Sequence, residues 1–164
     1  MSTAERRARE KAQRRQEILN AARQEFFERG FHSPTVDDVA ARAEVSKGTI
    51  YLYYESKEGI LAHLLLEGLN LLVKEMEAVC NPEQSSGADC TLQELANAYL
   101  GFCQSNPSYF RLIMAFDRGR FEESISHELH QQVMNKSLHG LDLLARTIEQ
   151  GKACLLYTSD AAED

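Results

Sequence analysis

Apolar side chains recur at helical spacing from the first third of the chain onward. The first series follows a polar start and consists of Ile18, Leu19, Ala22 and Phe26. Residues three and four positions apart lie on one face of an α-helix, so this series predicts a helix from about residue 17. Gly30 favours the end of that helix, because glycine adopts positive φ without strain.

Two short helices with a very short connection are predicted next. Thr35 is followed three residues later by Asp38, a capping-box pattern that begins a helix ending near Ala43. Ser46 can cap a second helix over residues 47–54. Helices of this length are unstable alone, so we expect them to pack on each other and on the first helix.

A longer apolar stripe begins after Ser56, which is another candidate N-cap. Its members are Leu61, Leu65, Gly68, Leu72, Met76 and Val79. The polar stretch CNPEQSSGADC at residues 80–90 ends the stripe. These positions predict one long helix, separated by a loop from the remainder of the chain.

Three more helices are predicted after this loop. Thr91 and Glu94 repeat the capping pattern, and Pro107 favours the first turn of a further, short helix. The last run covers roughly residues 122–150, and its apolar positions are expected to point inward: Ile125, Leu129, Val133, Leu141, Leu144 and Ile148. Helical spacing thus accounts for the apolar positions, and the predicted fold class is all-α.

Charge divides the chain into two parts. The net charge is −7, yet residues 1–60 carry 11 Lys and Arg against 10 Asp and Glu, whereas residues 61–164 carry 7 against 15. Residues 1–16 are basic and almost free of large apolar groups, so they are expected to form a flexible arm or the frayed start of the first helix. A cationic end on an acidic body suggests a polyanionic partner for that end alone.

Cysteine usage and hydropathy indicate the compartment. The four cysteines have no CxxC spacing, which favours buried or idle thiols over the alternative of a redox-sensing pair such as Cys80 and Cys90. The chain has no uninterrupted apolar run long enough to span a membrane, and its start is too charged for a secretory signal. We therefore expect a cytoplasmic protein without a membrane partner.

The tight connection between the second and third predicted helices is typical of a helix-turn-helix, which inserts its second helix into the major groove of DNA. In a helix over residues 47–54, Ile50 and Tyr54 lie one turn apart and are expected in the core. Tyr51 and Leu52 then flank the groove side. Tyrosine and threonine hydroxyls suit phosphates or base edges, and a leucine methyl can touch thymine.

The stretch TVDDVAARAEVSKGTIYLYYESKEGIL resembles the DNA-binding domain of TetR/AcrR-type transcriptional regulators, over about Ile18 to Leu65. The matching positions are Thr35, Ala40, Val45, Ser46, Thr49, Ile50, Tyr51, Tyr54, Lys57 and Glu58. The resemblance implies operator contacts from Thr35, Lys47, Gly48, Thr49, Tyr51, Tyr53 and Lys57. One position departs from the family, because Glu44 replaces the usual glycine of the turn and must adopt a left-handed conformation.

The resemblance also implies a domain organisation. Residues 17–55 would form the helix-turn-helix domain and residues 56–153 a helical effector-binding and dimerisation domain, here incomplete. Residues 154–164 resemble translated sequencing-adapter read-through, with a natural short tail as the alternative. The implied partners are a palindromic DNA operator, an unidentified small-molecule effector and a second copy of the chain; no cofactor is implied.

Candidate effector-binding residues are aromatic and sulfur-containing side chains of the predicted second domain: Tyr99, Phe102, Cys103, Tyr109, Phe110, Met114 and Phe116. Each could equally fill the core. The sequence HELH at residues 127–130 could supply two metal ligands, although a solvated helix face is favoured because no third ligand is fixed. Metal ligands are therefore not predicted.

The sequence contains no GxSxG, P-loop, GxGxxG or HExxH pattern, so we do not expect an enzyme. A ligand-responsive repressor is the leading hypothesis. The alternatives are a constitutive DNA-organising or cell-division factor without an effector, and a helical protein-interaction module, which the net negative charge favours.

Overall fold

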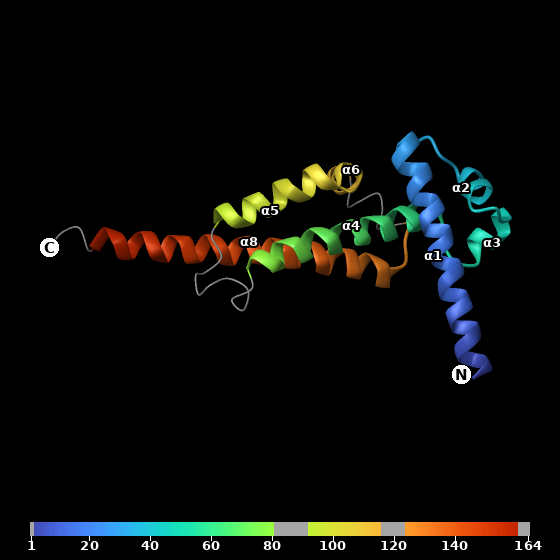
Figure 1. The fold of residues 1–164 in the computed structure, drawn as a ribbon, viewed down its shortest axis with the longest axis horizontal. Helices are drawn as coiled ribbons and strands as arrows, with labels where there is room; N and C mark the ends of the chain where they lie inside the picture. The colour runs from blue at the N-terminus through green and yellow to red at the C-terminus, as the bar shows by residue number, and fades with distance from the viewer. Residues whose placement is uncertain (1, 81–91, 116–123, 161–164) are drawn as a thin grey trace. The chain divides into compact units, whose positions relative to one another are not determined.

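The computed structural model describes residues 2–80, 92–115 and 124–160, with side chains described up to residue 150. The helices in Figure 1 are α1 (Thr3–Arg29), α2 (Val36–Arg42), α3 (Lys47–Tyr51), α4 (Lys57–Val79), α5 (Leu92–Ser105), α6 (Pro107–Ala115) and α8 (His127–Asp160). Within these ranges there is no strand, and the predicted all-α class is confirmed.

The chain forms two compact units. Unit 1 contains Met1–Leu65 and Ala115–His130, and unit 2 contains Leu66–Met114 and Gln131–Asp164. The division therefore falls inside α4, whereas the sequence suggested a boundary before residue 56. The first turns of α4 belong to unit 1 because their apolar residues Ile60, Leu61 and Leu64 are buried there.

The core of unit 1 forms where α1, α2, α3 and the start of α4 meet. Its fully buried members include Ile18 and Phe26 from α1, Val39 from α2 and Ile50 from α3. Tyr54, just after α3, is buried as well. The predicted core positions of Ile50 and Tyr54 are thus confirmed.

Local hydrogen bonds define the ends of the short helices as the sequence predicted. The Thr35 hydroxyl accepts from the Asp38 amide, and the Asp38 carboxylate accepts from the Thr35 amide, which completes a capping box. Ser46 caps α3 through the amide of Thr49, and Ser56 accepts from Gly59 at the start of α4. Serine and threonine cap helices because their oxygens satisfy amides that have no partner within the helix.

Glu44 adopts the left-handed conformation that the turn requires, with φ of 55°. This conformation costs a non-glycine residue about 1 kcal/mol. The backbone offsets the cost with hydrogen bonds on both sides, from Glu44 N to Ala41 O and from Val45 N to Ala40 O. The turn is intact despite the missing glycine.

The first sixteen residues are mostly helical rather than a separate arm. Helix α1 begins at Thr3, where Ser2 and Glu5 form a further capping box. The side chains of residues 3–16 are exposed, so this part of α1 depends on local bonds and ion pairs such as Arg6–Glu10.

Unit 2 packs α4, α5, α6 and α8 around the buried side chains Leu72, Met76, Leu95 and Phe102. Gly68 permits the closest approach between α4 and α6. A Cβ built on Gly68 would lie 2.8 Å from Cδ1 of Tyr109. The Tyr109 hydroxyl donates to Glu67, which fixes the ring across the glycine.

The prediction for the last helix is wrong at three positions. Ile125, Leu129 and Val133 are buried as expected, but Leu141, Leu144 and Ile148 are exposed. The face of α8 that turns inward in this region instead presents Leu143, packed against the core, and the buried Thr147. Helical spacing identified an apolar stripe, but it could not show whether the same chain covers it.

Two further findings concern only the described residues. None of their helices combines the length and apolar character needed to cross a membrane. Their His, Cys, Asp and Glu side chains form no group of three or more suited to a metal ion.

Candidate nucleic-acid interface

Helix α3 presents one face to the core and the opposite face to solvent. Successive residues of an α-helix are rotated by about 100°, so Gly48 and Leu52 lie opposite Ile50 and Tyr54. Leu52 is 75% exposed, and Tyr51 beside it is 49% exposed. The outward face of this short helix is therefore largely apolar and open.

Thr49 and Tyr53 flank this face and are half-buried. The Thr49 hydroxyl lies 2.9 Å from the Ser46 hydroxyl, so it takes part in the cap as well as facing outward. The Tyr53 amide donates to the carbonyl of Ile50 and continues the turn beyond α3. Of the predicted contact residues, Gly48, Thr49 and Tyr51 come together on one surface, with Tyr53 at its edge.

The two predicted lysine contacts are already engaged within the chain. Lys47 Nζ lies 2.7 Å from Asp37 Oδ2, and the Asp37 carboxylate raises the pKa of Lys47. Lys57 Nζ donates to the His32 carbonyl at 2.7 Å and lies 5.7 Å from the ring centre of Phe26. A phosphate contact by either lysine would compete with these interactions.

Thr35 is also occupied by a structural role. Its hydroxyl donates to the carboxylate of Asp38 at 2.6 Å, and this bond is the largest cause that lowers the pKa of Asp38 to about 2. Its hydroxyl proton is therefore unavailable to a phosphate while the cap is intact.

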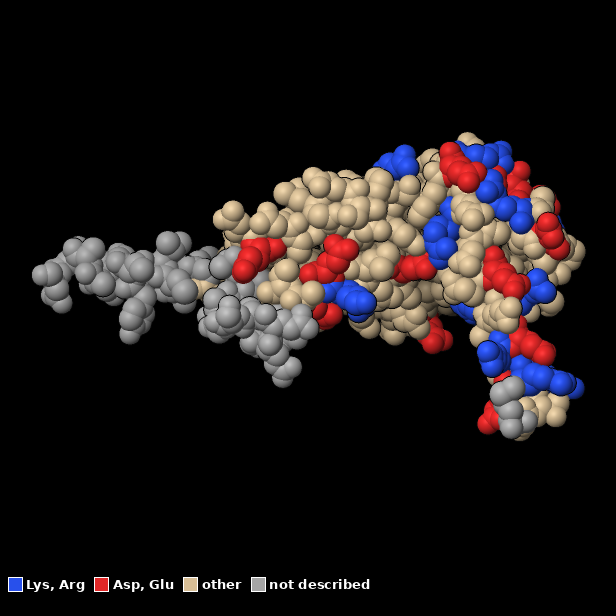
Figure 2. Space-filling model, viewed as in Figure 1, with Lys and Arg blue, Asp and Glu red and all other residues tan. Residues whose placement is uncertain are grey.

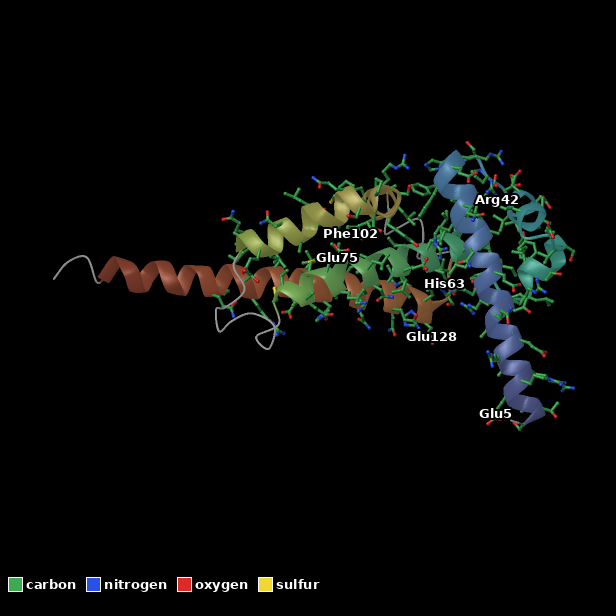
Figure 3. The ribbon with its side chains drawn as sticks, viewed as in Figure 1. Glu5, Arg42, His63, Glu75, Phe102 and Glu128 are labelled. Carbon is green, nitrogen blue, oxygen red and sulfur yellow. The ribbon has the colours of Figure 1, made fainter. Side chains whose placement is uncertain are left out.

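A buried ionic network fixes α2 against α1. Glu25 is almost fully buried and accepts hydrogen bonds from Arg29 and Arg42. Arg42, labelled in Figure 3, also donates to Glu28 at 2.6 Å. The bond from Arg29 is the main cause that lowers the pKa of Glu25. Two arginines of this domain are thus committed to its structure.

A second cluster joins α1, α4 and the end of α3. The Tyr54 hydroxyl donates to the Arg15 carbonyl, while the Arg15 guanidinium lies 5.0 Å from the Tyr54 ring centre. Arg15 also donates to Nε2 of His63, labelled on α4 in Figure 3. Burial, and then the Arg15 charge, lower the pKa of His63 to about 4, so the neutral ring can accept this bond at neutral pH. The cluster secures the buried side of the recognition segment.

Basic side chains without such commitments occur on the N-terminal half of α1. Arg7, Arg9 and Lys11 are exposed, and no ion pair or hydrogen bond links them to other described residues. Figure 2 shows basic and acidic side chains interleaved over unit 1. The sequence analysis favoured a solvated arm here; the Ser2–Glu5 capping pattern was the signal for a helix.

The predicted effector residues form part of the core of unit 2. Phe102, labelled in Figure 3, is fully buried, and Tyr99, Cys103, Tyr109 and Phe110 pack against its cluster. Met114 is 59% exposed, and Phe116 lies outside the described residues. An open groove of about 430 Å³ lies elsewhere in this unit, lined by Leu66, Asn70, Gln132, Asn135, Lys136 and His139.

The cysteines differ from one another. Cys103 is a free thiol, and burial, followed by its charge and hydrogen bond, raises the pKa of Tyr99. Cys80 is disulfide-bonded. The expectation of idle thiols is therefore wrong for Cys80.

The three helices of unit 1, their tight turn and the exposed face of α3 define a helix-turn-helix DNA-binding protein. Residues 18–64 match the family model described as bacterial regulatory proteins, tetR family. The chain therefore carries the N-terminal domain of the TetR family and is, by that domain, one of its members. The family consists of transcription regulators rather than enzymes.

Curated relatives match over the DNA-binding part. The chain is 39% identical over 61 residues to the fatty acid metabolism regulator protein of Bacillus subtilis, covering 37% of this chain and 31% of that protein. It is 32% identical over 91 residues to the transcriptional regulator HbdR of Aromatoleum, covering 56% and 38%. The matches thus span about a third of the length of these relatives.

Solved structures share the fold over a larger part of the chain. A regulatory protein of the tetR family from Rhodococcus RHA1 has a TM-score of 0.64 at 22% identity, over 86% of this chain and 70% of that one. PfmR from Thermus thermophilus has a TM-score of 0.62 at 23% identity, over 83% and 70%. At these identities the likeness establishes the fold alone.

Proposed function

We propose that the chain is a transcriptional repressor that binds a palindromic operator as a homodimer, inserting α3 of each copy into the major groove. A small molecule that binds unit 2 would release the operator. Effector and DNA would then weaken each other's binding, as linkage requires.

The exposed face of α3 is the observation that carries this proposal. Leu52 and Tyr51 are open to solvent although large apolar groups on a single helix face are normally covered. Ile50 and Tyr54 anchor the opposite face in the core. A rigidly mounted, exposed helix face suits insertion into a groove about 12 Å wide.

Phosphate binding must come partly from residues other than Lys47 and Lys57, which are engaged in the free protein. Arg7, Arg9 and Lys11 on α1 are available for it. Figure 1 shows the N-terminal half of α1 running past α3 with no other helix beside it. We infer that this half of α1 lies along the DNA backbone next to the groove that α3 enters.

Neutralising these three residues as Arg7→Gln, Arg9→Gln and Lys11→Gln is expected to weaken binding to every duplex, because phosphate contacts carry no sequence information. The slope of log affinity against log salt should fall by about 2 for each copy. The measurement uses duplexes selected from a random-sequence pool by the unmodified chain, with an unselected duplex alongside.

The matched control removes three positive charges from unit 2 through Lys74→Gln, Arg111→Gln and Lys136→Gln. The same change in net charge should leave the salt slope nearly unchanged there. Equal slopes for both triple variants would show that α1 makes no phosphate contacts. Failure of the unmodified chain to select any duplex would remove the DNA-binding proposal itself.

A second copy of the chain would cover the exposed stripe of α8. The stripe consists of Leu138, Leu141, Leu144 and Ile148, which lie within about a third of the helix circumference. Contiguous exposed apolar groups of this kind mark protein-protein contacts. Pairing through α8 would give the dimer two recognition helices for a palindromic operator.

The effector part of the proposal rests on unit 2, which provides the aromatic cluster around Phe102 and the open groove near Lys136. Palmitate is the first probe, because one relative is named as a fatty acid metabolism regulator. Binding should raise the melting temperature by mass action and release the selected duplex. A melting temperature unchanged at saturating palmitate would exclude this effector class.

A further inference from the structure

Gly48 has no structural reason within the chain to be glycine. Its φ is not positive, and a Cβ built on it would meet only the Ser46 Oγ, at an ordinary contact distance of 3.8 Å. Glycine nevertheless destabilises a helix relative to alanine. An external partner that approaches the backbone closely would account for the missing side chain.

Leu52 lies one turn beyond Gly48 on the same outward face. It is the most exposed of the large apolar side chains in the described residues, at 75%. Gly48 adds no side chain beside it, so the two positions form a shallow apolar recess bordered by Leu52. Tyr51 and Thr49 flank this recess on either side of the helix face.

The chemistry of the recess selects among the bases of a major groove. Hydrogen bonds are not available from the leucine side chain or from a glycine that has none. Thymine is the base that presents a methyl group in the major groove, at C5, and apolar side chains contact it. A backbone without a Cβ allows that methyl group to come close to the helix.

We propose that Gly48 and Leu52 form a specificity-determining contact with the 5-methyl group of a thymine in each operator half-site. This inference rests on the proposed DNA-binding function and adds to it the identity of one recognised base. Lys47 is a weaker source of specificity here, because its ammonium group is paired with Asp37.

The test replaces thymine by uracil, one position at a time, in the duplexes that the unmodified chain selects. Uracil keeps the hydrogen-bonding groups and removes only the methyl. At one thymine of each half-site, the affinity of the unmodified chain should fall about fourfold per half-site, the effect of one buried CH₂-sized group. Leu52→Ala should bind the thymine duplex more weakly and bind both duplexes equally.

A second variant separates stability from recognition. Gly48→Ala should melt at the same temperature or higher, because alanine favours the helix, yet bind the selected duplex at least tenfold more weakly. Its affinity for unselected duplex should change much less. Gly101→Ala is the matched control, since a Cβ there meets nothing within 4 Å and α5 lies in unit 2.

The outcomes distinguish this inference from the function on which it rests. Selected half-sites without thymine, or uracil substitutions without effect at every position, overturn the methyl contact while operator binding stands. Wild-type affinity in Gly48→Ala overturns the recess. If the chain selects no duplex, the proposed function and this inference fail together.

Discussion

The double substitution Leu141→Asp and Ile148→Asp is expected to convert a dimer in solution into a monomer and to lower the affinity for a two-half-site operator by about 10²-fold or more. Both side chains are exposed on α8, so the folded chain can accept aspartate there. A second chain that buried them would instead have to bury unpaired carboxylates. The loss in affinity follows because linked half-site contacts strengthen each other by about 10²–10⁴-fold.

The measurements are the molar mass by light scattering and the affinity for the selected duplex. Asn135→Asp with Gln150→Asp is the control, because both positions are exposed on α8 outside the stripe and add the same negative charge. The control should keep its dimer mass. A Leu141/Ile148 variant that also keeps its dimer mass would show that another surface joins the copies.

The substitution Phe102→Ala is expected to lower the free energy of unfolding by about 3–5 kcal/mol. Phe102 is fully buried, and Leu72, Met76 and Leu95 surround it in the core of unit 2. Removing the ring loses its burial and leaves a cavity that the surrounding helices fill only in part. The melting temperature should fall by roughly 10 °C.

Met114→Ala provides the comparison, because this residue was also a candidate for effector binding but is 59% exposed. Its unfolding free energy should change by less than about 0.5 kcal/mol. A cost for Phe102→Ala below about 1 kcal/mol would mean that the ring faces an existing cavity. Such a result would favour effector binding over core packing for this residue.

Features encoded by neighbouring residues were predictable from the sequence. Thr35, Ser46 and Ser56 each lie within three residues of the amide that they cap, so their patterns locate the helix starts. The burial of Ile50 and Tyr54 followed from their spacing of four. Even the left-handed Glu44 was predictable, because the length of the turn leaves no alternative.

Features that depend on distant residues were not predictable. Lys47 was assigned to DNA, but its partner Asp37 is ten positions away on another helix. Lys57 bonds a carbonyl twenty-five positions away, and its role could not be inferred from its place beside Ser56. The motif identified these lysines, but the folded domain decides whether they are free.

The sequence by itself determined the helices, their caps, the helix-turn-helix and the family, because those properties depend on hydrogen bonds and periodicities within a few residues. Only the tertiary structure decided which side chains remain available to a partner. It exposed Leu52 beside Gly48, engaged the lysines and uncovered Leu141 and Ile148. Availability depends on contacts between segments far apart in the chain, and a local pattern does not specify them.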